Sequence, residues 1–318
     1  MKKISLFTPC YNEEGNVRNI YEAVTKVMET MPQYDYEYIF IDNCSQDKTP
    51  EILKEIAEKD KHVKVIFNLK NFGPGRSGYY GFLQTTGDVS ICMACDLQDP
   101  PELIPEFIKR WEQGYKVVWG QKEGSEESKF MYFIRGLYYK IIKLFSDEIQ
   151  IEQVTGFGLY DREVMDLIRS VEEPDPILRN LIMDFGYEIS LIQYKQPKRK
   201  AGKSSYNFIK YFSTALNSLV STSSGFLRIA TLSGFFISGI SFLIGLYYLI
   251  MKLIFWDSFV MGTAPIMIGL FFLGSVQLFF IGIIGEYIGV VLKRLTKRPL
   301  VVEKERLNFD KNDEEVKE

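Results

Sequence analysis

Histidine and cysteine are scarce in this chain of 318 residues, which contains one histidine and four cysteines. A structural zinc site needs four nitrogen or sulfur ligands, which the sequence usually supplies in closely spaced pairs. Cys92 and Cys95 form a Cys-x-x-Cys pair, but they lie in an apolar stretch that we interpret as a buried strand, and no second pair accompanies them. Zinc binding and thiol redox chemistry are therefore not expected, and His62 is expected in a surface turn.

The glycine-rich phosphate loops of common nucleotide-binding folds are also missing. No Gly-x-Gly-x-x-Gly follows the first predicted strand, and the chain has no Walker A lysine, so neither a Rossmann cofactor site nor a P-loop is indicated. Gly73-Pro74-Gly75 is instead expected to form a tight turn into a helix. Because the net charge is −3 at pH 7, nucleic acid is not an expected partner.

Charged residues are missing from two long stretches near the carboxyl end of the chain. Residues 229–251 and 259–285 contain no Asp, Glu, Lys or Arg, and each exceeds the roughly 20 residues that a helix needs to cross a bilayer. We predict two transmembrane helices that form a hairpin with both outer ends on one side. No signal peptide is recognised, because only a few apolar residues separate Met1-Lys-Lys3 from Asn12.

Basic residues flank this predicted hairpin on both sides. Six lie between Lys195 and Lys210, and four lie between Lys293 and Arg298. By the positive-inside rule, both ends of the chain face the cytoplasm, which predicts a multi-pass protein of the cell (inner) membrane. The predicted domains are a cytoplasmic catalytic domain at 1–205, an interfacial amphipathic helix at 206–227, two spans within 228–292 and a cytoplasmic tail at 293–318. Gly285 and Gly289 permit close helix packing, so a homo-oligomer is also expected.

The amino-terminal 200 or so residues alternate short apolar strands with helical stretches. This alternation predicts an α/β domain with a doubly wound, mainly parallel sheet. Asp161 and Thr49 are expected to cap helices. Strands are predicted at residues 4–8, 36–42, 63–67, 89–95, 116–120 and 189–194, with a further extended segment at 154–162.

Four of the predicted strands end in polar residues. In chain order these residues are Asn12 and Glu13, Asp42 and Asp47, Asn71 and Arg76, and Asp96 and Gln98. The carboxyl ends of parallel strands meet at one edge of a sheet, where open α/β proteins bind their ligands. Turn formation explains any one of these residues alone, but the same pattern on four strands favours a ligand site.

The most informative strand end is that of the fourth strand, where Asp96, Gln98 and Asp99 precede Pro100-Pro101. A carboxylate and an amide oxygen two residues apart can hold a hard divalent cation, which can also bridge substrate phosphates. The alternative is that Asp96 and Asp99 only cap the turn before the two prolines. Acidic rather than glycine-rich strand ends favour a metal-bridged nucleotide diphosphate over a Rossmann cofactor.

Seven short motifs follow one another in a characteristic order. They are Pro9-Cys-Tyr-Asn-Glu13, Asp42 with Asp47, Asn71-Phe-Gly73, Asp96-Leu-Gln-Asp-Pro-Pro-Glu102, Arg199-Lys-Ala-Gly-Lys-Ser204, Gly285-Glu-Tyr287 and Arg298-Pro299. Together with the predicted hairpin, this order resembles the family-2 glycosyltransferases of the polyprenyl-phosphate type. That group includes dolichol-phosphate mannose synthase and its bacterial undecaprenyl-phosphate relatives, and the resemblance covers nearly the whole chain.

The resemblance implies a GT-A fold and an enzyme that transfers a sugar, with inversion, from a nucleotide sugar such as a UDP-hexose to a membrane polyprenyl phosphate. It implies that the nucleotide is held by Pro9, Tyr11, Glu13, Asp42 and Asp47. It implies that Mg²⁺ or Mn²⁺ is bound by Asp96 and Gln98. It implies that the catalytic residues, beside Asp96, are Arg135, Arg199 and Lys203, which face the acceptor phosphate.

The chain departs from this family at two places. Ala94 stands where the family usually has the first carboxylate of an Asp-x-Asp motif, so Asp96 must carry more of the metal binding. An acidic residue that has been proposed as a base in the family has no direct equivalent, and Glu152 lies nearby. A lipid phosphate is already ionised near neutral pH, so it needs positioning by cations more than deprotonation.

Two other functions remain open. A processive polysaccharide synthase has a related domain, but its Gln-x-x-Arg-Trp motif lies near the membrane. The only Arg-Trp here is Arg110-Trp111, early in the chain and with Phe107 in place of the glutamine. A catalytically weak scaffold that recruits a lipid-sugar flippase is the second alternative, and Ala94 is the residue that favours it. The sequence does not identify the sugar.

Overall fold

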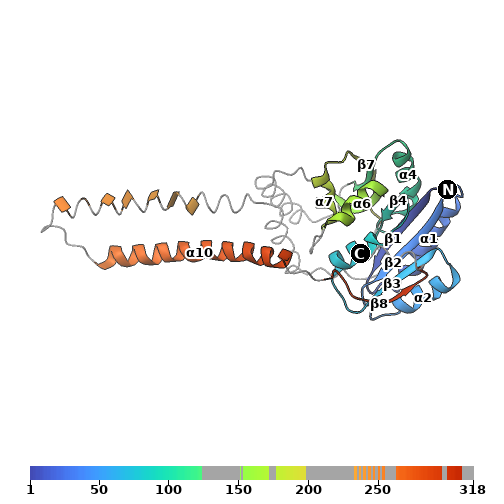
Figure 1. Cartoon of the computed structure of the whole chain (residues 1–318), viewed down its shortest axis with the longest axis horizontal. Coiled ribbons are helices and arrows are strands. Elements are labelled where there is room, and N and C mark those ends of the chain that lie inside the picture. The colour runs from blue at the N-terminus through green and yellow to red at the C-terminus, as the bar shows by residue number, and fades with distance from the viewer. Residues whose placement is uncertain are drawn as a thin grey trace. The chain divides into compact units, whose positions relative to one another are not determined.

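The computed structural model describes residues 1–123, 151, 153–171, 177–197, 263–295 and 299–309, together with scattered residues between 233 and 254 (Figure 1). The chain divides into two compact units. The first unit consists of Met1–Ser128, Gln150–Ser205 and Lys297–Glu318, and the second of Lys129–Ile149 and Tyr206–Thr296.

The first unit is built on one eight-stranded sheet with the strand order β7-β5-β6-β4-β1-β2-β3-β8. Its strands are β1 (Lys3–Cys10), β2 (Asp35–Asp42), β3 (Val63–Asn68), β4 (Val89–Cys92), β5 (Val117–Lys122), β6 (Val154–Asp161), β7 (Ile189–Tyr194) and β8 (Glu303–Leu307). The central strands β4, β1, β2 and β3 run parallel, as do β5 and β7, whereas β6 and β8 run antiparallel to their neighbours. The predicted mainly parallel α/β sheet is therefore confirmed.

Helices cover both faces of this sheet. They are α1 (Val17–Glu29), α2 (Thr49–Lys59), α3 (Pro74–Leu83), the short η1 (Pro101–Leu103), α4 (Ile104–Glu112), α6 (Arg162–Ser170) and α7 (Leu178–Phe185). Leu6 and Tyr38 pack in a core with α1, α2 and α4, whereas the next residues along each strand, Phe7 and Ile39, pack with α3, α6 and α7. Successive side chains of a strand point to opposite faces, so a sheet covered on both faces requires the continuous apolar runs seen in the sequence.

Several local predictions are settled by the structure. Asp161 caps α6, because its side chain accepts a hydrogen bond from the Glu163 amide at 3.0 Å. His62 lies exposed in a turn, and Gly73 takes a φ of 87° directly before α3, both as predicted. The prediction for Thr49 is wrong: its hydroxyl accepts the Glu13 amide of another loop at 2.8 Å instead of capping α2.

The fourth strand is shorter than predicted, because β4 ends at Cys92 rather than at Cys95. The amide of Met93 still bonds to the Phe7 carbonyl of β1, at 3.0 Å. The amide of Ala94 then donates to the Asp99 carboxylate at 3.0 Å, so a side chain replaces the neighbouring strand as the acceptor. The chain therefore leaves the sheet just before Asp96.

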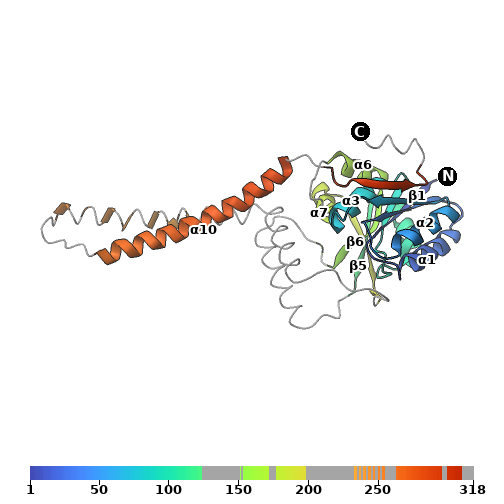
Figure 2. The same cartoon turned by 90° about the horizontal axis from the view of Figure 1, so that it is seen from below.

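The last strand, β8, is not predicted from the sequence. Its residues Glu-Lys-Glu-Arg-Leu contain one apolar side chain, so they show neither the alternation nor the continuous apolar run that marks a strand. The strand pairs antiparallel with β3 at the edge of the sheet, with Val65 opposite Leu307. Figure 2 shows β8 beside α3, although about 220 residues separate them in the sequence.

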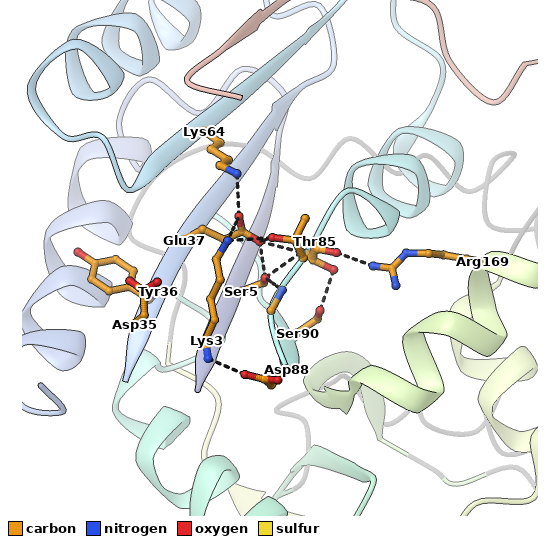
Figure 3. A network of polar contacts seen from close by, with 12 residues as sticks. Lys3, Ser5, Asp35, Tyr36, Glu37, Lys64, Thr85, Asp88, Ser90 and Arg169 are labelled. Atoms are coloured by element: carbon orange, nitrogen blue, oxygen red, sulfur yellow. Dashed lines mark hydrogen bonds and ion pairs between the residues drawn. The ribbon is translucent and has the colours of Figure 1, made fainter. Parts of the chain in front are cut away.

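A buried polar network lies at the amino ends of the central strands (Figure 3). The Glu37 carboxylate pairs with the Lys3 and Lys64 ammonium groups at 2.9 Å each, and it accepts hydrogen bonds from Ser5 and Thr86. Burial opposes ionisation, but Lys64, Ser5 and Lys3 outweigh it and lower the pKa of Glu37 to about 2. This network joins β1, β2 and β3 at the edge opposite the candidate site.

The second unit contains α10 (Thr263–Leu295), a helix of 33 residues. The described residues between 233 and 254 that pack beside it are also helical, and a Cβ atom at Gly234 would lie 3.6 Å from the Phe280 ring. Counting only residues whose placement is described, no helix is long and apolar enough to cross a membrane. The predicted interfacial helix at 206–227 lies outside the described residues.

Candidate active site at the carboxyl edge of the sheet

The ends of β1 and β2 bring the predicted nucleotide-binding residues to one edge. Pro9 pairs in register with Ile41, and Cys10 pairs with Asp42. Glu13 follows in the loop after β1, together with Tyr11, whose side chain is 37% exposed. The topology therefore confirms that the two predicted strand ends meet, and nucleotide binding by these residues stays a prediction.

Five hydrogen bonds interlock the loops that follow β1 and β2, and one of them runs from the Lys48 amide to Glu14 Oε2 at 3.1 Å. The Asn12 amide donates to Ser45 Oγ and the Gln46 amide to Asn12 Oδ1, both at 2.8 Å. The Glu13 amide donates to Thr49 Oγ1 at 2.8 Å, and the Glu14 amide to Asp47 Oδ2 at 3.1 Å. Asn12 and Cys44 take left-handed φ values of 55° and 63°, a conformation that non-glycine residues seldom adopt. The two loops are thus held as one unit before any ligand binds.

Asp47, which we predict to bind nucleotide, has contacts of its own in this interlock. Its Oδ1 accepts the Thr49 amide at 3.0 Å, in addition to the contact with Glu14. Burial opposes its ionisation, but the hydrogen bonds from Thr49 and Glu14 lower the pKa of Asp47. Asp47 therefore braces the start of α2, which is the role expected for Thr49.

Asp42 is the most unusual carboxylate at this edge. Its side chain is 2% exposed, and Oδ2 accepts the Ser45 amide at 3.1 Å. Oδ1 is buried and has no hydrogen-bond partner among the residues that the structure describes. Burial raises the pKa of Asp42, which means that the ionised form is destabilised where it stands. A buried acceptor without a partner destabilises a protein by about 1–3 kcal/mol, so Oδ1 offers a ready position for a ligand N–H or O–H group.

Side-chain amides continue the site from β2 to α3. Asn43 Nδ2 donates to Asn71 Oδ1 at 3.1 Å, and Asn68 Nδ2 donates to Asn43 Oδ1 at 3.2 Å. Asn68 Nδ2 also donates to Ser77 Oγ of α3 at 2.9 Å, and the Gly73 amide donates to Asn71 Oδ1 at 2.8 Å. This amide cluster (Asn43, Asn68, Asn71 and Ser77) fixes the start of α3 against the ends of β2 and β3.

The turn after β4 carries the predicted metal ligands. Asp96 Oδ1 accepts the Gln98 amide at 3.2 Å, and Leu97 between them takes a φ of 59°. Asp99 accepts the Ala94 amide and the Tyr194 hydroxyl, each at 3.0 Å, and burial raises the pKa of Asp99. Asp99 therefore braces the turn, and Asp96 does so through the Gln98 amide; the metal-binding role of Asp96 stays a prediction.

The oxygen ligands of this turn decide whether it suits a divalent cation. Among the described residues, no group of three or more His, Cys, Asp or Glu side chains is placed to hold a metal ion. Both oxygens of Asp99 are engaged and Ala94 offers none, which leaves the Asp96 carboxylate and the Gln98 amide. Mg²⁺ commonly binds through one or two carboxylates, with substrate phosphates and water completing its shell. The residues fit a cation that binds together with a diphosphate, and they do not form a complete protein cage.

Sequence reasoning missed a cation at this site, Lys122. It is the last residue of β5 and lies opposite Tyr194 of β7, whose hydroxyl binds Asp99. Burial lowers the pKa of Lys122, although the nearby carboxylates of Asp99 and Asp96 act to raise it. The sequence contained a signal for this residue, because Lys122 is a polar residue at the end of a strand, as Asp42 is. It was missed because the predicted strand ended at Gly120, two residues too early.

The residues predicted to face the acceptor are not among those that the structure describes. Arg135, Arg199 and Lys203 lie outside the described residues, and so does Glu152. Their roles stay predictions.

A mainly parallel sheet whose carboxyl edge carries acidic and amide side chains is a ligand-binding architecture, and comparison with known proteins identifies its class. Residues 5–168 match the model of glycosyl transferase family 2. The chain is 33% identical over 305 residues to bactoprenol glucosyl transferase of Shigella phage SfX, covering 96% of this chain and 99% of that protein. It is 32% identical over 305 residues to the putative glycosyltransferase CsbB of Bacillus subtilis (strain 168), covering 95% and 91%.

The chain therefore belongs to glycosyl transferase family 2 and is a glycosyltransferase, as the order of its motifs predicts. Among solved structures, glucosyl-3-phosphoglycerate synthase from Mycobacterium tuberculosis, in complex with Mn²⁺, uridine diphosphate and phosphoglyceric acid, has a TM-score of 0.49 and 15% identity. That match covers 70% of this chain and 77% of the synthase.

Proposed function

We propose that this glycosyltransferase moves a hexose from a UDP-sugar to undecaprenyl phosphate or another polyprenyl phosphate, with inversion and with the help of Mg²⁺ or Mn²⁺. The observation that carries the donor half is the buried, unpartnered Asp42 Oδ1 at the edge where β1 and β2 end. The acceptor half is supported by the name of the phage relative, bactoprenol glucosyl transferase, which matches 96% of this chain.

The donor nucleoside is proposed to bind between the loops after β1 and β2. Asp42 Oδ1 accepts an N–H or O–H group of the nucleoside, which removes the penalty for burying an unpartnered acceptor. Tyr11 is 37% exposed at the same edge, and its ring is proposed to stack on the base. Pro9 and Glu13 complete this pocket, and the interlocked loops give it its shape before the donor binds.

The diphosphate is proposed to lie over the turn after β4. Asp96 and Gln98 would hold the cation, which acts as a Lewis acid and neutralises the charge of the leaving nucleotide when it is bound. Asp99 fixes the turn through Ala94, and Lys122 adds a positive charge beside it. A fixed positive environment stabilises the departing diphosphate because it needs no reorganisation during the reaction.

The acceptor phosphate is proposed to be positioned by Arg135, Arg199 and Lys203. Arginine suits bidentate phosphate recognition and lysine supplies a point charge. A phosphate oxygen of the acceptor then attacks the anomeric carbon of the sugar, while the bond between that carbon and the nucleotide diphosphate breaks. Because the attacking oxygen is already an anion, the step needs no base.

The enzyme is proposed to be a multi-pass protein of the cell membrane with its catalytic domain and both termini in the cytoplasm. The uncharged stretches 229–251 and 259–285 and their basic flanks support this placement. Large apolar side chains on α10 are exposed, including Leu270 at 64% and Leu278 at 70%, as a lipid-facing helix requires. The spacing of Gly285 and Gly289 supports a homo-oligomer.

One specific observation favours a second function. Ala94 removes a carboxylate that the family usually has, which would suit a catalytically weak scaffold that recruits a lipid-sugar flippase. A transfer assay separates the two. Membranes containing the full chain are given undecaprenyl phosphate and a panel of radiolabelled nucleotide sugars, with Mg²⁺ or Mn²⁺. The enzyme transfers label from one donor to the lipid, and chelator abolishes the transfer. A folded chain that transfers no sugar from any donor would refute the enzyme and favour the scaffold.

A further inference from the structure

One face of α3 is in contact with the carboxyl-terminal segment of the chain. The residues of that face are Arg76 and Tyr80, and Gln84, which caps the end of the helix, continues their spacing of four and so lies in line with them. The contacts are Arg76 Nη2 to the Pro299 carbonyl at 2.7 Å, the Tyr80 hydroxyl to Glu303 Oε1 at 2.6 Å, and Arg306 Nη2 to Gln84 Oε1 at 2.7 Å. Every turn of α3 is thus tied to residues 299–306.

Arg306 is the centre of these contacts. Its guanidinium pairs with Glu303 at 2.6 Å, lies 3.2 Å from the Tyr80 hydroxyl, and stacks 4.8 Å from the centre of the Phe309 ring. The side chain is only 12% exposed. Burial opposes its charge, but the hydrogen bonds and ion pair with Glu303 raise the pKa of Arg306. The guanidinium is thus held in place by three neighbours besides Gln84.

The same segment holds β3 and α2. Asn68, the last residue of β3, lies opposite Glu303 at an irregularity of the β3–β8 pairing, and the Leu69 amide donates to the Val302 carbonyl at 2.9 Å. After β8, Asn308 Nδ2 donates to the Ala57 carbonyl of α2 at 2.6 Å. We name residues 299–309 the carboxyl-terminal clamp.

The three elements that the clamp contacts, α3, β3 and α2, each carry a residue that takes part in the hydrogen bonds of the candidate donor site. Asn68 of β3 and Ser77 of α3 belong to the amide cluster. Thr49 at the start of α2 accepts the Glu13 amide. No residue of the clamp belongs to the strand ends that form the site, so any effect of the clamp on the donor must pass through these elements.

We propose that the carboxyl-terminal clamp positions the donor site, with Arg306 as its main positioning residue. The clamp holds α3 and the end of β3 so that the amide cluster and the Asn71–Gly73 turn are already in place when the nucleotide binds. The identity of that nucleotide rests on the proposed function, whereas the mechanical link does not. Binding is tighter when a site needs no ordering, because the ordering entropy is not lost on association.

Two tyrosines of α3 provide a matched test. Tyr80→Phe removes the hydroxyl that binds Glu303 and Arg306, whereas Tyr79→Phe removes a hydroxyl that donates to the Ile168 carbonyl at 3.1 Å, outside the clamp. Arg306→Met is the stronger variant, and Arg306→Lys keeps the charge without the planar fork. Each full-length variant is purified and titrated with UDP and Mn²⁺. Hydrogen exchange is measured at residues 68–77, and transfer kinetics are measured with the donor that labels the lipid.

Arg306→Met is expected to raise the Kd for UDP about tenfold, because the free energy of the lost charge-assisted contact within the protein must then be supplied when the nucleotide orders the site. Arg306→Lys and Tyr80→Phe are expected to raise the Kd for UDP by a few-fold, and both are expected to speed amide hydrogen exchange at residues 68–77. The donor KM rises while kcat is kept, because the clamp touches no reacting atom. Tyr79→Phe leaves the Kd for UDP and the exchange at 68–77 unchanged, even where it lowers the Tm.

The proposal is overturned if Arg306→Met and Tyr80→Phe bind UDP as the unaltered chain does, or if Tyr79→Phe weakens binding as much as Tyr80→Phe. If the unaltered chain binds no UDP, the proposed donor fails. The exchange measurement then decides on the clamp alone: faster exchange at 68–77 in Arg306→Met supports the clamp, and unchanged exchange refutes it.

Discussion

Replacing Glu37 by glutamine tests whether the network at the amino ends of the strands stabilises the domain as its geometry indicates. The substitution keeps the size of the side chain but removes the charge that faces Lys3 and Lys64 at 2.9 Å. Both ammonium groups lose the carboxylate that they share, and the ammonium group of Lys64 is itself buried. Removing one partner of a buried charge pair is strongly destabilising.

The magnitude follows from the pKa. The fall from the ordinary value of 4.5 to about 2 in the folded protein corresponds to about 3 kcal/mol, at about 1.4 kcal/mol per pKa unit. Because the folded-state pKa of this carboxyl group is depressed, its contribution is fully present above about pH 4.5 and is lost as the pH falls towards 2. Glu37→Gln is therefore expected to lower the free energy of unfolding by about 3 kcal/mol at pH 7, and by less than half of that near pH 3.

Urea unfolding of the purified full chain, followed by tryptophan fluorescence, measures this difference at each pH. The control is Glu55→Gln, whose carboxylate pairs with Arg18 and Lys59 at the surface, where ion pairs contribute little. Equal stability of Glu37→Gln and the unaltered chain at pH 7 would refute the reasoning. So would a deficit that stays constant as the pH falls.

Three further predictions concern Asp42, Asp99 and Asp161. Asp42→Asn is expected to raise the Tm, because burial raises the pKa of Asp42 and disfavours its charge. The same substitution is expected to raise the Kd for UDP at least about tenfold. A lowered Tm or an unchanged Kd for UDP would contradict this prediction. Asp99→Asn is expected to lose the bond from Tyr194 and to weaken Mn²⁺-dependent UDP binding, whereas metal-independent binding stays the same; titrations with and without Mn²⁺ measure both. Asp161→Ala is expected to lower the free energy of unfolding by about 2 kcal/mol in urea, because it removes the α6 cap and the bond from Trp111 at 2.6 Å; a loss below about 0.5 kcal/mol would argue against the cap.

The central strands and their site edge could be predicted because each strand repeats one local signal. A strand covered on both faces must be apolar throughout, and a ligand edge places polar residues directly after it. Asp42 and Asp96 both follow such runs, and the structure shows them at the same edge of one sheet. The cap at Asp161 is equally local, since it depends only on the two residues after it.

What could not be predicted depends on contacts between distant residues. Asp99 braces its turn through Tyr194, which lies 95 residues away, and nothing near either residue indicates the other. The strand β8 is mostly charged, and its Arg306 contacts Tyr80 and Gln84, which lie more than 200 residues away in the sequence. Thr49 has the composition of a cap, but its hydroxyl binds the more distant Glu13 amide. In each case a tertiary contact overrides the local preference.

The lipid product itself tests most directly whether the chain transfers a hexose to a polyprenyl phosphate. The purified full chain is incubated with undecaprenyl phosphate, the UDP-hexose that labels membranes and Mg²⁺, and the lipid is analysed by mass spectrometry. We expect the unaltered chain to add a single hexose to the lipid phosphate, and we expect no glycosylated lipid with chelator or with Asp96→Asn. Free hexose without glycosylated lipid, or a lipid carrying a growing sugar chain, would contradict this expectation.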